Sequence, residues 1–313
     1  MTYYLISQER SPYYNQALEE RLFHLDLEED ILLIWQNRPT LVFGCYQNPF
    51  YEINIPYAWA EKLPIIRRIS GGGTVYHDEG NVNYTVITTV DPEELDFLRI
   101  LKPLEEALHR MGYPVEIRNR CDIYLGDAKI SGNAQKLSRN RLLHHGTLLF
   151  DSDLNRLRIS SSKKQEKMIS KGIKSRPAHV GNLKEAGGEA ETVEEFIDGL
   201  RREWLPRGAK ILDLSPEFLN SVEVLAKEKY QSWDWTFGAS PEHRFQGTWI
   251  QSGKKISLSY RAGKGRIQVA ELYVGGRRRL DWERAIIGLA MDEQSMANFC
   301  RISFGEDFLD EII

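Results

Sequence analysis

The pattern of apolar and polar residues predicts strands and helices in mixed order along the chain. Apolar side chains at helical spacing, such as Tyr14, Leu18 and Leu22, predict an amphipathic helix that begins at Pro12. Short apolar runs bounded by turn residues predict strands. Strands are expected at residues 3–7, 31–35, 40–44, 65–70, 115–135 and 142–150, and helices at 56–63, 92–112, 192–204 and 215–230. Because no βαβ rhythm runs through this order, it favours an α+β fold over a doubly wound sheet.

Two of the predicted helices carry local signals that can be checked. Pro103 lies inside the helical pattern of residues 92–112, where the missing N–H and the ring are expected to kink or divide the helix. Thr192 and Glu195 have the spacing of a capping box, which predicts a helix starting just after Thr192.

The last 80 residues or so form a second group of predicted strands and helices. The aromatic stretch QSWDWTFG at residues 231–238 ends in a turn, and strands are expected at residues 243–250, 255–260 and 266–274. Helices are expected at residues 281–291 and 293–299. We therefore predict a catalytic domain at residues 1–230 and a small α+β accessory domain at residues 231–313.

Composition and charge narrow the class of protein. With 313 residues, 42% hydrophobic and 27% charged, the chain has the composition of a packed globular protein. A net charge of −4 gives no basic footprint for nucleic acid. No apolar run reaches the length of a membrane helix, and no signal peptide is visible. Cys45, Cys121 and Cys300 are scattered and odd in number, which suits reduced thiols and predicts a cytoplasmic protein.

The first stretch that suggests chemistry is IIRRISGGGTVYHDEGNVNYTVITTV, which begins at Ile65. Gly71, Gly72 and Gly73 leave the main chain without Cβ atoms, so that a ligand can lie directly against it. Arg67 and Arg68 precede these glycines and point to opposite faces of the predicted strand, so one of them is expected to serve the loop. Amides beside a guanidinium suit a planar or tetrahedral anion. The same sequence would also suit an ordinary glycine-rich turn with solvated arginines.

The second stretch is GDAKISG at residues 126–132, in which Lys129 follows a turn and precedes small residues. The ammonium group of a lysine can contact a carboxylate and a phosphate oxygen together. Alone, Lys129 would more often be an ordinary surface lysine.

Taken together, RRISGGGTVYHDEGN, KISGNA and HHGTLLF resemble the lipoate–protein ligases of the bacterial two-domain type. The resemblance continues through RNRCDIYLGD, SKGIKSRPAHVGNL and QSWDWTFG, keeps one fixed order and covers nearly the whole chain. It implies a large mixed-sheet catalytic domain of the biotin/lipoate-ligase type with an α+β accessory domain. It also implies that lipoate, or octanoate, reacts with ATP and Mg²⁺ to give lipoyl-AMP. The acyl group then passes to a lysine of its partners, the lipoyl domains of α-keto acid dehydrogenase complexes, the glycine-cleavage H protein, or both.

The resemblance also assigns roles to residues. Lys129 is expected to be catalytic, holding the substrate carboxylate and the α-phosphate in line. Positions expected to bind the nucleotide are Arg68, Gly73, Thr74, Val75, Tyr76, Asp122 and Lys129, with Asp122 also a candidate metal ligand. Positions expected to bind the acyl substrate are Gly71, Gly72, His77, Gly132, Ala134 and His145. Of His77, His144 and His145, each could be a wall of the site or handle a proton.

Further segments leave alternatives open. Residues 170–183 match the loop that covers the adenylate in the family, although the polar composition of residues 160–182 also suits a flexible surface segment. The amide of Gln47 could bind ligand or belong to a plain turn. We also hypothesise that the accessory domain swings during turnover.

Other functions remain to be weighed against the ligase. Octanoyltransferases, which need no ATP, use a cysteine nucleophile. Cys121 stands where the ligase family often has Asn, but neither Cys121 nor Cys45 matches the position of that nucleophile. A biotin–protein ligase would lack the combination RRISGGG and KISGNA, and an intact Lys129 argues against a binding protein that has lost catalysis.

Overall fold

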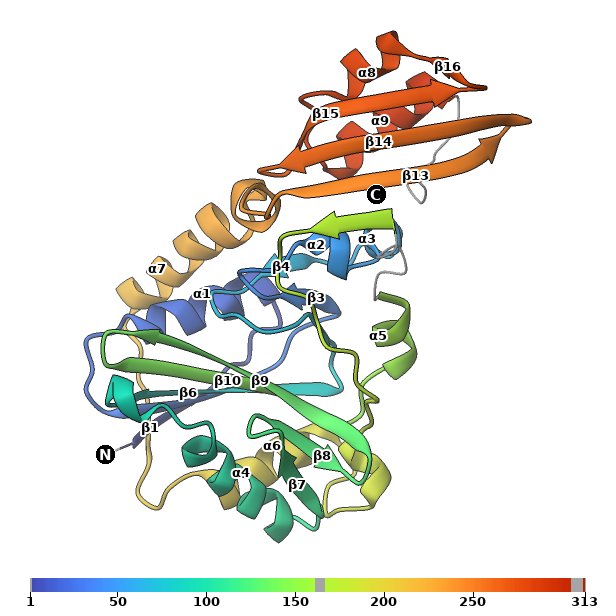
Figure 1. Cartoon of the computed structure of the whole chain (residues 1–313). Coiled ribbons are helices and arrows are strands. Elements are labelled where there is room, and N and C mark those ends of the chain that lie inside the picture. Colours follow the sequence, from blue (N-terminus) through green and yellow to red (C-terminus); the bar gives the residue numbers. More distant parts are fainter. Residues whose placement is uncertain (1, 161–166, 305–311, 313) are drawn as a thin grey trace.

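The computed structural model of the chain describes residues 2–160, 167–304 and 312, and within these ranges the strands form three sheets (Figure 1). The largest described sheet has eight strands in the order β12-β1-β2-β6-β10-β9-β8-β7. Strands β1, β2 and β12 pair in parallel and the others antiparallel, so the sheet is mixed. Its members are β1 (Thr2–Ile6), β2 (Asp30–Trp35), β6 (Asn81–Thr89), β7 (Val115–Arg118), β8 (Asp122–Leu125), β9 (Ala128–Ser138), β10 (Arg141–Leu149) and β12 (Lys210–Ile211).

Helices cover both faces of this sheet. Leu101 and Leu104 of α4 (Leu98–Arg110) pack with Phe196 of α6 (Val193–Trp204) in one apolar cluster. On the other face, Leu18 and Leu22 of α1 (Pro12–Phe23) pack in a second cluster with residues of α7 (Pro216–Leu225). The remaining helices of the described chain are α2 (Pro49–Glu52), α3 (Ile55–Ala60), α5 (Leu154–Ser160), α8 (Leu280–Ile286) and α9 (Glu293–Phe304), with short turns η1 (Pro92–Glu94), η3 (Leu183–Ala186), η4 (Ala226–Tyr230) and η5 (Asp234–Gly238).

A small sheet, β4-β3-β5, holds the glycine stretch at the edge of the main domain. Its strands are β3 (Thr40–Phe43), β4 (Ile65–Arg67) and β5 (Val75–His77). The three glycines lie in the connection between β4 and β5, both of which pair with β3. The loop therefore leaves and re-enters the same small sheet, which fixes its two ends.

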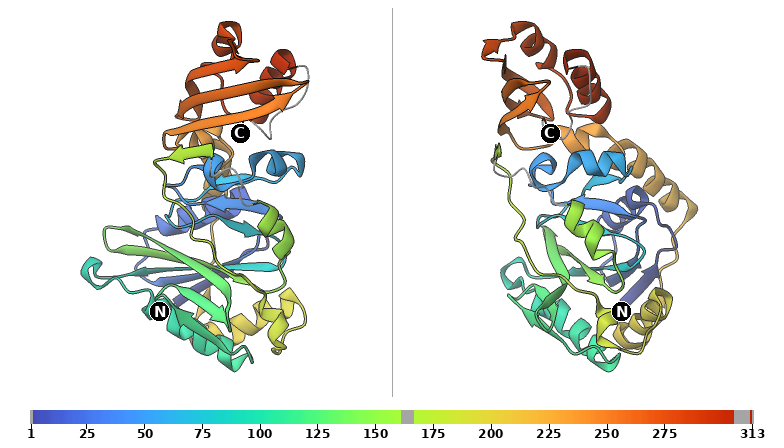
Figure 2. Two further views of the ribbon diagram at one scale, coloured as in Figure 1. Left: turned by 45° about the vertical axis from the view of Figure 1, so that its right-hand side comes forward. Right: turned by 90° about the vertical axis from the view of Figure 1, so that its right-hand side faces the viewer.

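The C-terminal sheet lies at one end of the molecule and takes a strand from elsewhere in the chain (Figure 2). Its order is β11-β13-β14-β15-β16, with strands β11 (Met168–Ser170), β13 (His243–Gln251), β14 (Lys254–Gly263), β15 (Arg266–Val274) and β16 (Arg277–Arg278). Met168 pairs with Phe245, and both side chains are buried in the same apolar cluster. The polar segment after α5 thus contributes the edge strand of the C-terminal sheet and crosses the predicted division at residue 231, which stays a prediction.

Arg67 ties the segment between the two domains to the small sheet. This arginine is 1% exposed, and its guanidinium donates to the carbonyls of Cys45, Gln47, Trp235 and Thr236 and to the Ser240 hydroxyl. Burial lowers the pKa of Arg67 to about 10, which leaves it charged at neutral pH. Because its five polar partners lie in or beside the QSWDWTFG stretch and just after β3, Arg67 fastens these two segments together.

Most predicted elements are confirmed, and one local prediction is wrong. The mixed main sheet with helices on both faces confirms the α+β class. Thr192 and Glu195 form the capping box that opens α6. Pro103, in contrast, does not divide its helix, since α4 runs unbroken from Leu98 to Arg110. The helical pattern instead breaks earlier, between η1 and α4, and α4 continues through Pro103 although the proline, as the sixth helical residue, cannot donate to the Arg99 carbonyl; a kink at Pro103 stays a prediction.

Residues 161–166 of the polar segment predicted to be flexible lie outside the described residues. Within the ranges that the structure describes, no helix has the length and apolar character needed to cross a membrane.

Candidate functional site

Arg68 shapes the glycine loop from within. Its guanidinium is buried and donates to the Gly71 carbonyl at 2.6 Å, the Gly73 carbonyl at 2.7 Å and, through Nε, the Ser70 hydroxyl at 3.1 Å. Burial lowers the pKa of Arg68 to about 10, so the side chain remains a cation at neutral pH. Arg67 turns to the other face, as the strand alternation predicted. The expectation that one arginine serves the loop is confirmed, with Arg68 as that residue.

The glycines of the loop are required by close contacts. Gly72 has φ +87°, and a Cβ added there would lie 2.9 Å from Arg68 Nη2 and 3.4 Å from the Ala134 Cβ. The loop therefore packs against β9 at Ala134, and the binding of an acyl tail beside these residues stays a prediction. Gly44, which the sequence reasoning did not single out, approaches even more closely, because an added Cβ would lie 2.3 Å from the Gly72 carbonyl oxygen.

Lys129 lies on β9 and is paired with Asp122 of β8. The Nζ–Oδ1 distance is 2.7 Å, and the two side chains are 24% and 17% exposed. Gly132 makes room for the lysine, since a Cβ added there would lie 3.3 Å from Lys129 Cε. The ammonium group is thus oriented by a carboxylate and still reaches solvent, which suits a cation that meets an incoming anion.

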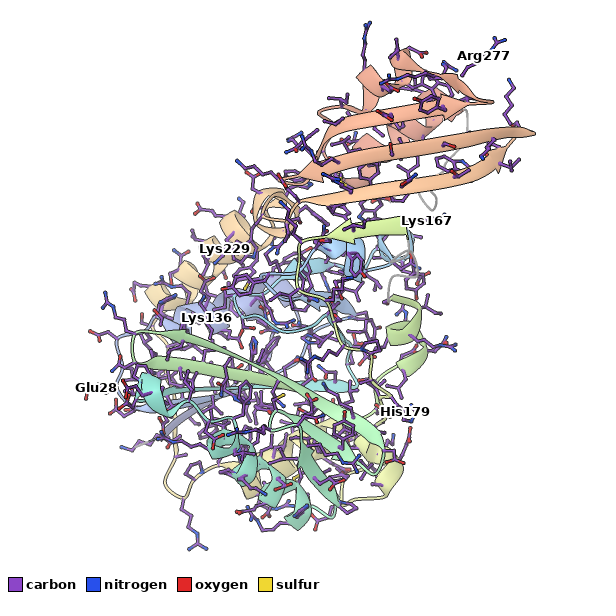
Figure 3. The ribbon with its side chains drawn as sticks, viewed as in Figure 1. Glu28, Lys136, Lys167, His179, Lys229 and Arg277 are labelled. Atoms are coloured by element: carbon purple, nitrogen blue, oxygen red, sulfur yellow. The ribbon has the colours of Figure 1, made fainter. Side chains whose placement is uncertain are left out.

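The segment predicted to cover the adenylate connects the glycine loop to Lys129. The Thr74 amide donates to Ser175 Oγ at 2.9 Å. Further along, the Lys129 amide donates to the His179 carbonyl at 2.8 Å, and the Gly181 amide donates to the Lys129 carbonyl at 3.2 Å. Figure 3 shows His179 beside the strands that carry the lysine. Two regions far apart in sequence are therefore bridged by one segment.

Val75 and Tyr76, expected at the nucleotide, lie on β5 and pair with Val42 and Leu41. Burial raises the pKa of Tyr76 to about 12, so the phenol is neutral. The Tyr76 side chain is 2% exposed and belongs to an apolar cluster. Any contact of this residue with nucleotide would therefore come from the main chain.

The three histidines separate into different roles. His145 contacts Glu19 Oε1 through Nδ1 at 2.8 Å and Ser70 Oγ through Nε2 at 2.6 Å, which links α1 to the glycine loop. Because the carboxylate is an acceptor, Nδ1 donates to Glu19, and Nε2 lies against the Ser70 hydroxyl. Glu19 is fully buried, so this array positions Ser70 under the loop.

His77 and His144 contact side-chain amides and aromatic rings instead of the glycine loop. His77 Nδ1 meets the amide of Asn37 at 3.0 Å, and its ring lies edge-on to Trp35. His144 stacks on Tyr84 and contacts Gln135. Burial lowers the pKa of both histidines to about 3, so both are neutral at physiological pH.

Cys121 bears on the thiol-transfer alternative. Its carbonyl accepts from Asn133 Nδ2 at 2.9 Å, and burial together with the neighbouring Asp122 raises the pKa of the thiol. A thiol that resists ionisation is a poor nucleophile. The cysteine at this position therefore supports the strand structure and gives no support to covalent acyl transfer.

No described group of three or more His, Cys, Asp and Glu side chains is arranged to hold a metal ion. The charged partner of Asp122 is Lys129. Asp122 as a metal ligand stays a prediction, since a magnesium ion would arrive with ATP and bring phosphate oxygens of its own.

Two residues of the site were weighed weakly or missed from the sequence. The amide of Gln47 contacts Gly44, Thr74 and Ser175 and so joins three segments of the chain, while a contact of this residue with ligand stays a prediction. Glu52 was missed, although a carboxylate within the apolar run PFYEINI is a signal of a buried polar contact.

Comparison with known proteins shows the family of the chain. Residues 11–204 match the family model of the lipoyl protein ligase A/B catalytic domain. The chain is 33% identical to the lipoate-protein ligase LplJ of Bacillus subtilis over 319 aligned positions, which cover 96% of both chains.

Two solved structures share the fold. A lipoate-protein ligase A bound with ATP superposes with a TM-score of 0.60 at 20% identity, covering 75% of this chain and 97% of that one. The bipartite lipoate protein ligase of Thermoplasma acidophilum, studied with its E2 lipoyl domain, gives a TM-score of 0.61 at 19% identity, covering 75% and 94%. These likenesses confirm the predicted fold class, and the family match and the Bacillus relative show that the chain belongs to the lipoate–protein ligase family.

Proposed function

We propose that this ligase carries out both half-reactions in one chain. In the first, a carboxylate oxygen of lipoate attacks the α-phosphorus of MgATP, the bond to the β-phosphate oxygen breaks, and pyrophosphate leaves. In the second, the amine of an acceptor lysine attacks the acyl carbonyl of lipoyl-AMP and AMP leaves. The observation that carries the proposal is the bridging segment, which bonds to the glycine loop at Thr74 and to Lys129 further along, and this supports one site shared by the two.

The role of Lys129 follows from charge. Carboxylate and triphosphate repel each other, and negative charge grows at the α-phosphate in the transition state. An ammonium group between the carboxylate and the triphosphate reduces their repulsion and stabilises the charge that grows at the α-phosphate. It also holds the two reacting groups in line. The Asp122 carboxylate, 2.7 Å from Nζ, orients the ammonium group before the substrates arrive.

The nucleotide is assigned to the glycine loop and the strand that follows it. The main chain of Gly73, Thr74, Val75 and Tyr76 is the proposed contact region, and Arg68 shapes that region through its bonds to Gly71 and Gly73. The ATP-bound relative of similar fold supports a nucleotide in this family. Magnesium belongs to the substrate, as MgATP.

The acyl tail is assigned to the slot between the glycine loop and β9, lined by Gly71, Gly72, Gly132 and Ala134. A Cβ added at Gly71 would lie 3.6 Å from the Tyr46 ring, which places an aromatic wall beside the small residues. His145 acts here through Ser70, and His77 is proposed to support the wall from behind.

The proposed partners are lipoyl domains of α-keto acid dehydrogenase complexes, the glycine-cleavage H protein, or both. The archaeal ligase studied with its E2 lipoyl domain supports the first class. We place the reaction in the cytoplasm, where the thiols of Cys45, Cys121 and Cys300 would stay reduced.

Lipoate-dependent exchange between ATP and pyrophosphate, measured without an acceptor, tests the proposal. Exchange is expected, because adenylation needs no acceptor. Absence of exchange together with acyl transfer from a carrier without ATP would instead establish the transferase alternative.

A further inference from the structure

Glu52 is a buried carboxylate whose partner lies 123 residues away. It ends the four-residue helix α2, is 5% exposed, and both of its oxygens lie 3.2 Å from the Ser175 amide nitrogen, which donates to them. Burial raises the pKa of Glu52, which shows how strongly the carboxylate is removed from water. Burying a carboxylate costs free energy unless hydrogen bonds or a paired charge replace the lost water, and here the Ser175 amide supplies such a bond.

Gln47 holds the same serine from the side. Its Nε2 donates to Ser175 Oγ at 3.0 Å, while its Oε1 accepts from the Gly44 amide at 2.9 Å and the Thr74 hydroxyl at 3.1 Å. The residue is fully buried. One side-chain amide therefore joins the turn after β3, the glycine loop and the covering segment.

Ser175 is the point at which the covering segment meets the proposed nucleotide amides. Its hydroxyl accepts from the Thr74 amide at 2.9 Å, and a Cβ added at Gly73 would lie 3.2 Å from it. The attachments at His179 and Gly181, and that of the Ile173 amide to the Tyr46 carbonyl, use main-chain atoms that any sequence provides. The attachment at Ser175 depends on two particular side chains.

We propose that Glu52 and Gln47 are positioning residues of the ligase reaction, which clasp Ser175 and hold the covering segment over lipoyl-AMP between the two half-reactions. The inference rests on the proposed function and extends it to the retention of the intermediate. An acyl-adenylate that escapes is hydrolysed in water, so a closed segment protects it until the acceptor lysine arrives.

Retention is tested by preparing the enzyme with radiolabelled lipoyl-AMP and measuring the rate at which label leaves it. Glu52→Ala is expected to release the adenylate at least about tenfold faster, because a hydrogen bond to a charged group is lost. Glu52→Gln keeps one acceptor oxygen and is expected to restore release to within about threefold of wild type. Glu242→Ala is the matched control, since this exposed carboxylate pairs with Lys171 of the same segment and is expected to leave release unchanged.

Trypsin provides a second measurement that needs no catalysis. The bond between Lys174 and Ser175 adjoins the clasp, and mass spectrometry identifies its cleavage. Glu52→Ala is expected to be cut there at least about tenfold faster than wild type, because local opening exposes the bond. If no adenylate forms even in wild type, the proposed function fails, while the cleavage rates still decide whether the clasp exists.

Ser175→Ala covers the case in which Glu52→Ala does not fold, because it deletes the hydroxyl and leaves α2 intact. Release about threefold faster or more is expected from this variant. The proposal is overturned if the folded variants release adenylate and are cleaved at Lys174 at wild-type rates, or if Glu52→Gln behaves like Glu52→Ala.

Discussion

The two walls of the site are built by different means. The Lys129 wall consists of β8 and β9, whose pairing continues through β10 into the main sheet, so main-chain hydrogen bonds hold it. The glycine-loop wall is an irregular connection held by buried side chains, chiefly Arg68, His145 and Gln47. The comparison teaches that substitutions on the first wall should change chemistry alone, whereas substitutions on the second should change shape and stability as well.

Lys129→Ala is the strongest test of the first wall. We expect a roughly 1,000-fold loss of lipoate-dependent ATP–pyrophosphate exchange, because the cation that stabilises the developing phosphate charge is gone. The Tm should change little, since a partly exposed ion pair contributes about 1 kcal/mol or less. Unchanged exchange in a folded variant would refute the assignment, and a large fall in Tm would break the contrast between the walls.

Arg67→Met tests the side-chain anchoring behind the second wall. We expect the free energy of unfolding to fall by about 3 kcal/mol, because several buried carbonyls lose their donor. Chemical denaturation measures this, with Arg244→Met, an exposed position of β13, as the control. A loss below about 0.5 kcal/mol, the range of ordinary surface substitutions, would contradict the anchoring role.

The same contacts constrain the hypothesis that the accessory domain swings. A motion of this domain would have to break the hydrogen bonds of Arg67 or move the bonded groups together.

Arg68→Lys sharpens the comparison on the loop itself. A lysine keeps the charge but lacks the planar fork that reaches Gly71 and Gly73 together. We expect a loss of about 2 kcal/mol of stability and a rise in KM for ATP, measured by denaturation and by exchange at varied ATP. If stability and the KM for ATP both stay at their wild-type values, the charge of residue 68 suffices and the loop does not depend on the planar guanidinium.

His144→Gln tests how the buried imidazole of β10 makes the stability of the protein depend on pH. The folded pKa of His144, about 3, lies below its ordinary 6.5, so the unfolded chain binds the proton first as pH falls. The stabilisation is therefore complete above pH 6.5 and is lost towards pH 3, at roughly 1.4 kcal/mol per pH unit. The variant should show a correspondingly shallower slope in denaturation between pH 6 and pH 4. The exposed His24→Gln should keep the wild-type slope; equal slopes in all three proteins would contradict burial as the cause.

The strands and the positions of Arg67, Arg68 and Lys129 in the fold could be predicted from sequence, because these patterns are local, while the chemical roles of the site residues stay predictions. The alternation at Arg67 and Arg68 and the spacing around Lys129 involve residues that are adjacent in the sequence. The structure places these residues as expected. The proposed clasp could not be predicted, since Glu52 meets Ser175 only after the chain has folded. For the same reason the three residues of β11 gave no strand signal, because their pairing with β13 is a tertiary contact in a polar segment.

The edge strand β11 also bears on where this polypeptide could be divided. A chain cut after Tyr230 would give a C-terminal fragment in which β13 has lost its neighbour on one side, leaving a row of unpaired main-chain groups and the uncovered ring of Phe245. Open strand edges of this kind recruit one another. A separately produced accessory domain should therefore self-associate unless a peptide with the sequence of residues 167–171 is supplied, so the structural boundary of that domain includes a piece of chain that the sequence assigns to the other one.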